Sequence, residues 1–186
     1  MKVDTHTGLL DGAQQCLSPN HDERPEVPMD LIVIHNISLP PGEFGGTFIE
    51  DFFCNRLDAN AHDYFAEIAG LKVSSHLLIK RDGRVVQFVP FHKRAWHAGA
   101  SCFEGREQCN DFSIGIELEG TDELPYEEVQ YEMLSEIIVA LQQTYPTLAQ
   151  TRLVGHSHIA PSRKTDPGPA FNWAHLHGLI DSLANA

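Results

Sequence analysis

Two stretches of the chain have the pattern of strands buried in a sheet. Leu31–Ile34 is a continuous apolar run between Pro28 and the polar pair His35–Asn36, which is typical of a strand covered on both faces. Residues 113–119 alternate strictly, so one face of that strand is apolar and the other carries Ser113, Gly115, Glu117 and Glu119. We expect both strands in the centre of one sheet.

Shorter patterns add strands and loops. Residues 76–88 predict a hairpin, because Asp82-Gly83 separates two apolar runs and a tight hairpin turn needs positive φ angles. Leu153–Gly155 predicts a short strand that ends at His156. Residues 1–29 are polar and contain three prolines, which predicts an irregular N-terminal wrap around the domain. Residues 91–112 predict a long loop, and the segment 157–171, rich in proline and glycine, predicts a second one.

Apolar residues that recur with a period near 3.6 predict the helices. The clearest helix covers residues 126–144 and is stopped by Pro146. A last helix begins after Asn172, whose side chain can cap it. Residues 47–57 and 58–68 carry weaker helical patterns. Because strands and helices are interleaved, the predicted fold class is α/β (mixed α+β), with a central mixed sheet flanked by helices.

Length and charge narrow the class of protein. The length predicts one domain over residues 1–186. We expect the protein to be a monomer. The formal net charge of −13 argues against nucleic acid and anionic membranes as partners, because both need a basic surface. No run approaches the ~18 apolar residues of a membrane span. Met1–His6 lacks the apolar stretch of a signal peptide, so we expect a cytoplasmic protein whose four scattered cysteines are free thiols.

Eleven histidines are the unusual feature of the composition. His35 ends the first buried strand and His156 ends a later one, where polar groups line the crevice in which open α/β sheets bind ligands. Asp166 lies on the proline-rich loop that follows. Two imidazoles and a carboxylate are a common catalytic zinc set, which His35, His156 and Asp166 would fill. His158 is a rival ligand, and hydrogen-bonded structural histidines are the alternative that this spacing leaves open.

A carboxylate and an ammonium group accompany this candidate site. Glu117 projects from the polar face of its strand beside Gly115, which leaves room for an approaching group, and it can act as a general base there. Glu119 faces the same way and competes for this role, and a structural ion pair with an arginine is the alternative for Glu117. Lys164 precedes Asp166 by two residues, where an ammonium either stabilises an oxyanion or is a solvated loop lysine.

At these residues the sequence closely resembles the zinc-dependent amidases that act on 1,6-anhydro-N-acetylmuramyl peptides in bacterial peptidoglycan recycling. The likeness covers about residues 18–175, and it is carried by four long motifs: residues 33–46, 93–99, 109–121 and 155–169. The wider family has the fold of peptidoglycan-recognition proteins and phage-lysozyme-type amidases, a mixed sheet packed by helices. The resemblance implies hydrolysis of the amide between the lactyl group of an anhydromuramoyl unit and L-alanine.

Carried over residue by residue, the resemblance implies a zinc ion (Zn2+) held by His35, His156 and Asp166. It implies catalytic roles for Glu117 and Lys164. The substrate is then an anhydromuropeptide, and the resemblance places three residues in contact with it: Asn36, Trp96 and His97.

The resemblance also points to the part of the site that binds the stem peptide. Lys72 and Gln108 stand where relatives carry arginine for the carboxylates of that peptide. Lysine keeps the charge but lacks the two-pronged hydrogen bonding of arginine, and glutamine loses the charge. Arg106 and Arg81 are expected to compensate.

Two other functions compete with this interpretation. Peptidoglycan-recognition proteins of this fold bind without cleaving when a zinc ligand is lost, but all three expected ligands are present here. An amidase of different specificity would act on intact muropeptides or in the periplasm. The ratio of activity on anhydro and reducing-end substrates distinguishes that enzyme from the one expected.

Overall fold

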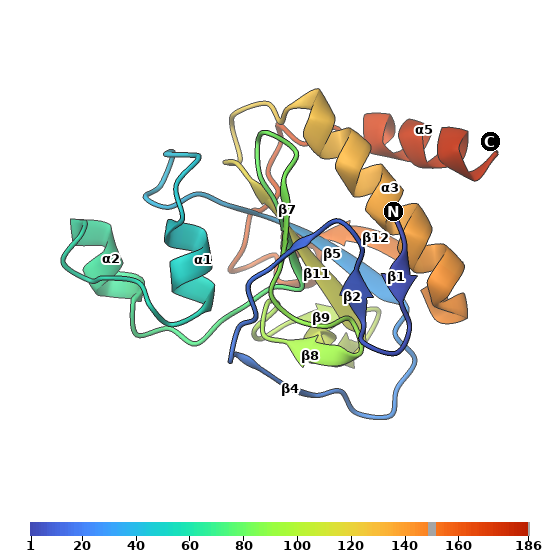
Figure 1. The fold of residues 1–186 in the computed structure, drawn as a ribbon, viewed down its shortest axis with the longest axis horizontal. Helices are drawn as coiled ribbons and strands as arrows, with labels where there is room; N and C mark the ends of the chain where they lie inside the picture. Colours follow the sequence, from blue (N-terminus) through green and yellow to red (C-terminus); the bar gives the residue numbers. More distant parts are fainter. Residues whose placement is uncertain (149–151, 186) are drawn as a thin grey trace.

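The computed structural model describes residues 1–148 and 152–185, and its centre is a six-stranded mixed sheet (Figure 1). In spatial order the strands are β12 (Arg152–Gly155), β5 (Leu31–Ile37), β11 (Ser113–Glu119), β6 (Leu77–Ile79), β7 (Val85–Gln87) and β3 (Gln14–Gln15). The first four run parallel to one another, and β7 pairs antiparallel with β6. This pairing confirms the predicted hairpin and the interior position of the two long strands.

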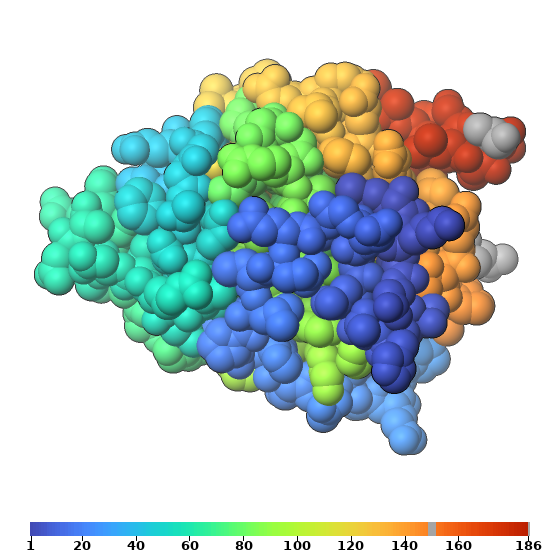
Figure 2. All heavy atoms as spheres, viewed as in Figure 1, coloured from blue at the N-terminus to red at the C-terminus, as the bar shows by residue number. Residues whose placement is uncertain are grey.

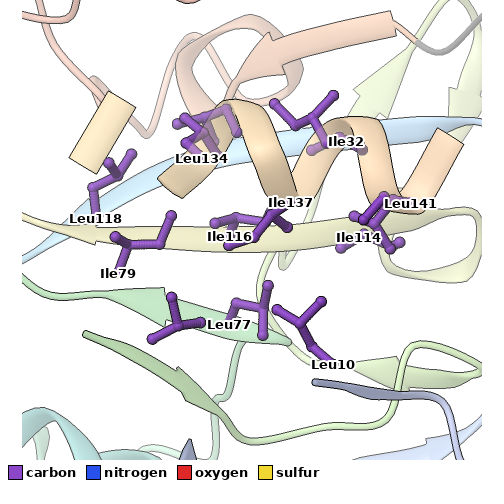
Figure 3. Packing of buried hydrophobic residues seen from close by; sticks show 14 of the residues in the cluster. Leu10, Ile32, Leu77, Ile79, Ile114, Ile116, Leu118, Leu134, Ile137 and Leu141 are labelled. Carbon is purple, nitrogen blue, oxygen red and sulfur yellow. The ribbon is translucent and has the colours of Figure 1, made fainter. Parts of the chain in front are cut away.

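One face of the sheet is covered by α3 (Glu128–Thr144), and α5 (Trp173–Ala184) packs against α3. The helix predicted from residue 126 begins at Glu128, because the Gln130 side chain accepts a hydrogen bond from the backbone of Glu127. Figure 3 shows the α3 side chains pointing at the apolar row of β11, and the labelled residues include Leu134, Ile137, Leu141, Ile114, Ile116 and Leu118. This cluster is the main core.

The opposite face carries a second core beneath two short helices, α1 (Phe48–Phe53) and α2 (Asp63–Ile68). Phe53 and Phe65 pack there with Leu78 and Val86, which project from β6 and β7 away from α3. Both helices are shorter than the predicted ranges 47–57 and 58–68. The chain leaves the helical conformation between them, because Asn55 takes a positive φ of 58° and the Asp58 side chain accepts a hydrogen bond from the backbone of Asn60.

The N-terminal segment, residues 1–29, contains more regular structure than predicted. It contributes β1 (Val3–Asp4), β2 (Leu9–Leu10), the sheet strand β3 and β4 (His21–Glu23), and β4 pairs with β8 (Lys93–Ala95). Figure 2 shows this segment, in blue, spread over one face of the molecule. The prediction of an irregular wrap was wrong in this respect, because strands of two or three residues are stabilised by distant partners and leave no local pattern.

The predicted loops also contain short elements. Residues 91–112 include β8, β9 (Cys102–Phe103), β10 (Arg106–Glu107) and the 3-10 turn η1 (Cys109–Asp111), and the loop after β12 opens with α4 (His156–Ile159). A further 3-10 turn, η2 (Pro146–Leu148), follows α3. Each is four residues or fewer, so the periodicity of the sequence cannot reveal it. Among the helices of the described ranges, none is both long and apolar enough to cross a membrane.

The packing of α3 on β11 predicts the cost of opening a cavity there. Leu134 is fully buried, so Leu134→Ala should lower the free energy of unfolding by about 2–5 kcal/mol. Leu124 lies just before the same helix with 46% of its surface exposed, and Leu124→Ala should change the value by less than about 0.5 kcal/mol. Urea unfolding followed by circular dichroism measures both, and equal effects of the two substitutions would contradict this packing.

Candidate metal centre and active site

Three candidate ligand atoms converge at the carboxyl end of the parallel strands. His35 Nδ1 lies 3.0 Å from His156 Nδ1 and 3.0 Å from Asp166 Oδ2. The distance between His156 Nδ1 and Asp166 Oδ2 is 3.1 Å. All three side chains are largely buried, and together they are able to hold a metal ion. The structure therefore brings together the three ligands expected from the sequence.

The register of the parallel strands produces this convergence. Glu117 on β11 pairs with His35 on β5, and Gly155 on β12 pairs with Ile34 on β5. His156, which follows β12 as the first residue of α4, therefore lies beside His35. The side chains of Glu117, His35 and His156 therefore start on, or directly after, adjacent strands at one level of the sheet.

Asp166 reaches the centre from the loop that follows α4. A Cβ on Gly155 would lie 2.6 Å from Pro167 Cδ, so only glycine lets this loop pack against the end of β12. The backbone N–H of Ser157 donates to the Asp166 carbonyl oxygen at 3.0 Å and fixes the loop. His158, the rival ligand, accepts a hydrogen bond from the backbone of Gly155 through its Nδ1. It does not belong to the converging set.

Hydrogen bonds behind the centre orient both imidazoles. His156 Nε2 donates to the carbonyl oxygen of Ala98 at 3.1 Å, so His156 Nδ1 keeps its lone pair. Ser113 Oγ donates to a backbone carbonyl oxygen and therefore accepts from His97 Nε2 at 3.1 Å. His97 Nδ1 is then the acceptor for His35 Nε2 at 2.9 Å. Both ligand histidines consequently present an unprotonated Nδ1 to the centre.

The chemistry of these donors fits a metal cation. In these tautomers the three converging atoms are all acceptors, and acceptors about 3 Å apart repel one another unless positive charge lies between them. Burial lowers the pKa of His35 to about 4, and it lowers the pKa of His97 well below its ordinary value. Neutral imidazole is the form that ligates metals.

Glu117 is the carboxylate that faces this centre. Its side chain is buried, with 8% exposure, and its Oε2 has no hydrogen-bond partner among the residues that the structure describes. Burial raises the pKa of Glu117 well above its ordinary value; nearby Asp166 raises it further, and Lys164 acts in the opposite direction. A buried carboxyl group that readily holds a proton suits acid–base chemistry.

Glu119, the competing carboxylate, has a structural role. Its Oε1 accepts a hydrogen bond from the backbone of Gly45 at 2.7 Å, and its Oε2 accepts one from the backbone of Arg81 at 3.1 Å. Glu119 thereby ties the loop before α1 to the end of the hairpin strand β6. Glu117 and Glu119 therefore project from the same face of β11 into different environments.

A cavity of about 380 Å³ opens over the centre. Glu117, Lys164 and the three candidate ligands line it together. One wall is apolar and comes from the α1–α2 region, with Phe52, Phe53, Tyr64, Ile68 and Leu71. The arrangement offers a polar, cation-binding floor beside a hydrophobic wall, which is typical of a small-molecule site.

Comparison with known proteins identifies the family. Residues 25–169 match the N-acetylmuramoyl-L-alanine amidase family. The chain belongs to this amidase family. A relative from Escherichia coli (strain K12), the 1,6-anhydro-N-acetylmuramyl-L-alanine amidase AmpD, is 58% identical over 175 residues, which cover 93% of this chain and 94% of that protein.

Solved structures agree with this assignment. A crystal structure of a selenomethionine derivative of AmpD has a TM-score of 0.93 at 55% identity, covering 97% of this chain and 99% of the other. The amidase AmiD from E. coli, solved with anhydro-N-acetylmuramic acid-L-Ala-D-gamma-Glu-L-Lys, has a TM-score of 0.56 at 28% identity, covering 92% of this chain and 60% of the other. The predicted fold and the resemblance to this group of amidases are confirmed.

The amidase cavity includes three of the five residues expected to contact substrate: Asn36, Trp96 and His97 line it. Trp96 Nε1 is buried and has no hydrogen-bond partner among the residues of the described ranges. Asn36 Nδ2 is engaged with Asp122 and Tyr126, at 2.8 and 2.9 Å. His97 is occupied by His35 and Ser113, so it also supports the amidase centre from behind.

The cations expected for the stem peptide lie elsewhere. Lys72 is exposed between two cavity-lining residues, Leu71 and Val73, but it is not part of the lining itself. Arg106 is bound by both carboxylate oxygens of Asp30 and lies over the ring of Phe112. Gln108 lines a different hollow, and the Arg81 side chain pairs with Glu127. The structure does not bring Arg106, Gln108 or Arg81 to the amidase cavity.

The sequence analysis did not predict the apolar wall of the cavity or the hydrogen bond from His35 to His97 behind the candidate ligands. Phe52, Phe53 and Tyr64 lie in or next to the weak helical patterns, but no chemical signal marked them as cavity residues. Gly115 was recognised as leaving room, and the approaching group is the His97 ring, because a Cβ on Gly115 would lie 2.4 Å from His97 Cγ. Only the fold identifies which group occupies that space.

The two glutamates of β11 should respond oppositely to neutralisation. The folded-state pKa of Glu117 is raised, so the folded protein binds the extra proton and loses stability as the pH rises above the unfolded value of about 4.3. In metal-free protein, Glu117→Gln should therefore raise the melting temperature at pH 7 and have little effect near pH 4. Glu119→Gln should lower stability by about 1–3 kcal/mol, because one accepted backbone hydrogen bond is lost.

Thermal unfolding in the presence of a chelator measures both effects. The same sign of change for the two variants at pH 7 would contradict the different environments assigned to these carboxylates.

Proposed function

We propose that this amidase is a zinc enzyme that hydrolyses the lactyl–L-alanine amide bond of 1,6-anhydro-N-acetylmuramyl peptides during cytoplasmic peptidoglycan recycling. The convergence of His35, His156 and Asp166 beside Glu117 carries the proposal, and Glu117 Oε2 has no hydrogen-bond partner in the described part of the chain. The E. coli relative, at 58% identity, is named as an amidase of this substrate. The more distant AmiD was solved with an anhydromuramyl tripeptide as its substrate.

His35 Nδ1, His156 Nδ1 and Asp166 Oδ2 would hold the zinc ion. When bound, zinc polarises the amide carbonyl and lowers the pKa of a water molecule from ~15.7 towards ~7. Two imidazoles and one carboxylate are a common ligand set of catalytic zinc sites. The contacts of His35 with His97 and of His156 with Ala98 support this role, because they leave both Nδ1 atoms free.

The chain's own residues manage the protons and the developing charge. The Glu117 carboxylate accepts the proton of the attacking water and passes it to the departing amine nitrogen, and its raised pKa suits both transfers. Lys164 Nζ stabilises the negative charge that develops on the carbonyl oxygen. The buried setting of Glu117 keeps competing water away from the carboxyl group.

We assign substrate contacts to the residues that line the cavity. Trp96, Asn36 and His97 line the cavity, and we assign the contacts with the substrate to their exposed atoms. Lys72, exposed beside the cavity-lining residues Leu71 and Val73, is our candidate for a carboxylate of the stem peptide. Arg106 is left out of this assignment, because Asp30 already binds its guanidinium group.

The remaining sequence-based expectations belong to the same proposal. We propose one amidase domain over residues 1–186, supported by the N-terminal segment, whose β3 extends the central sheet and whose β4 pairs with β8. We also propose that this amidase acts as a cytoplasmic monomer; its net charge of −13 argues against an anionic membrane surface as its partner.

A metal-dependent assay tests the function directly. The purified protein should release the peptide from 1,6-anhydro-N-acetylmuramyl-L-alanyl peptides faster than from the reducing-end counterparts, a chelator should abolish the reaction, and zinc should restore it. His35→Ala should keep its circular dichroism spectrum and lose bound zinc, measured by elemental analysis. Chelator-resistant hydrolysis, faster cleavage of reducing-end substrates, or stoichiometric zinc in His35→Ala would overturn the proposal.

The role of Glu117 predicts a loss of rate without a loss of metal. Glu117→Gln should lower kcat by ~10²-fold or more, which is typical of removing a general base. Its zinc content should stay at the wild-type level, because Glu117 is not a ligand. Glu119→Gln is the matched control, and a larger rate loss in that variant would mean that the wrong carboxylate had been assigned.

Lys164 should act on the transition state more than on the bound substrate. Lys164→Ala should lower kcat by roughly 10²-fold with a smaller change in KM, since charge on the carbonyl oxygen develops only during the reaction. Lys72→Ala should instead raise KM with kcat intact, because a carboxylate is held equally in both states. Steady-state kinetics of the zinc-loaded variants distinguishes these patterns. A pure KM effect for Lys164→Ala would make it a binding residue.

A further inference from the structure

Two cysteines that are distant in the sequence lie side by side outside the amidase centre. Cys16 follows β3, and Cys54 follows the last turn of α1. Their sulfur atoms are 3.5 Å apart, although both are free thiols in the structure. The other two cysteines provide a natural contrast within the same chain, because Cys102 is exposed and Cys109 is buried.

The two sulfur atoms differ in exposure and in their neighbouring groups. Cys16 is partly exposed, and Nη2 of the Arg56 guanidinium lies 3.7 Å from its sulfur. The guanidinium can donate a hydrogen bond to this sulfur, and the thiolate is the form that reacts with peroxides. Cys54 has only 8% exposure, and its thiol contacts the carbonyl oxygens of Cys16 and Leu17 at 3.5 and 3.7 Å. Burial raises the pKa of the Cys54 thiol, which keeps it protonated.

Hydrogen bonds hold the two segments together at this point. The Cys16 backbone N–H donates to the carbonyl oxygen of Gln87 at 2.9 Å, which fixes the first cysteine to the sheet. Ser18 Oγ and Asn20 Nδ2 both donate to the carbonyl oxygen of Phe53, the residue before Cys54. The pairing of the thiols is therefore built into the contact between the N-terminal segment and α1. A small movement of the sulfur atoms would bring them to the ~2.05 Å of a disulfide.

We propose that Cys16 and Cys54 form a peroxide-reactive modification site that closes into an intramolecular disulfide. The Cys16 thiolate attacks one oxygen of hydrogen peroxide, the O–O bond breaks, and Cys16 becomes a sulfenic acid. The departing hydroxide takes up the proton that the Cys16 thiol released and leaves as water. The sulfur of Cys54 then attacks the Cys16 sulfur, and the S–OH bond breaks. The hydroxyl group leaves with the thiol proton as a second water. Peroxide is reduced and the two thiols are oxidised.

The location of this site gives the disulfide a defined structural effect. Phe52 and Phe53, directly before Cys54, line the amidase cavity. The bond would tie that wall covalently to the segment that carries β3. Because it closes a long loop of the unfolded chain, the oxidised protein should also have a higher melting temperature than the reduced protein.

Mass spectrometry after treatment with hydrogen peroxide tests the proposal. The wild-type protein should lose two hydrogen atoms and yield a cross-linked peptide that joins Cys16 to Cys54, and a reductant should reverse both changes. The Cys102→Ser/Cys109→Ser double variant should behave identically, because it retains the pair. Absence of the Cys16–Cys54 cross-link, or its replacement by dimers linked through Cys102, would overturn the proposal.

Single substitutions assign the order of the two thiols. Cys54→Ser should accumulate a Cys16 sulfenic acid that dimedone traps, whereas Cys16→Ser should leave Cys54 unmodified at the same dose. Arg56→Gln should slow the first oxidation several-fold. Equal dimedone labelling of wild type and Cys54→Ser, or rapid oxidation of Cys54 in Cys16→Ser, would refute the mechanism. These readouts are independent of zinc and of amidase activity, so they stand whatever the outcome of the hydrolysis assay.

Discussion

The parallel pairing of β5 with β11 and β12 is the constraint on which the rest of the molecule depends. This register places Glu117 beside His35 and brings His156 to the same level. A slip of one residue would turn every side chain of a strand to the opposite face. The apolar row of β11 prevents such a slip, because Ile114, Ile116 and Leu118 are fully buried beneath α3 (Figure 3). The core and the candidate centre are thus opposite faces of the same strands.

The centre combines groups that are unfavourable when buried alone. Three acceptor atoms lie about 3 Å apart, and Glu117 Oε2 has no partner among the described residues. An unsatisfied buried polar atom typically costs about 1–3 kcal/mol. The extensive apolar core offsets this cost. The groups that carry this local cost are therefore also the groups suited to bind a cation and a substrate.

The N-terminal segment supports the site indirectly. Asn20 and Ser18 hold the end of α1, whose phenylalanines form the apolar wall of the cavity. Arg24 reaches the buried His76 at 3.2 Å, and the Nδ1 of His76 accepts a hydrogen bond from the backbone of Gly115 at 3.0 Å. These contacts connect residues far apart in the chain. The N-terminal segment thereby stabilises both the cavity wall and the strand that carries Glu117. It also places Cys16 beside Cys54.

The sequence by itself determined the elements with strong local patterns. The run Leu31–Ile34, the alternation of residues 113–119, the Asp82-Gly83 hairpin and the long helix were all predictable, because burial imposes a period on side chains. The candidate ligands and Glu117 were also recognisable by residue type and facing. The tertiary structure decided what depends on distant partners: the short strands of residues 1–29, and the backbone hydrogen bonds that occupy both carboxylate oxygens of Glu119. It also decided the apolar wall and the separation of Arg106 from the cavity. Hydrogen bonds and packing between segments far apart in the chain set these features, and no local pattern records them.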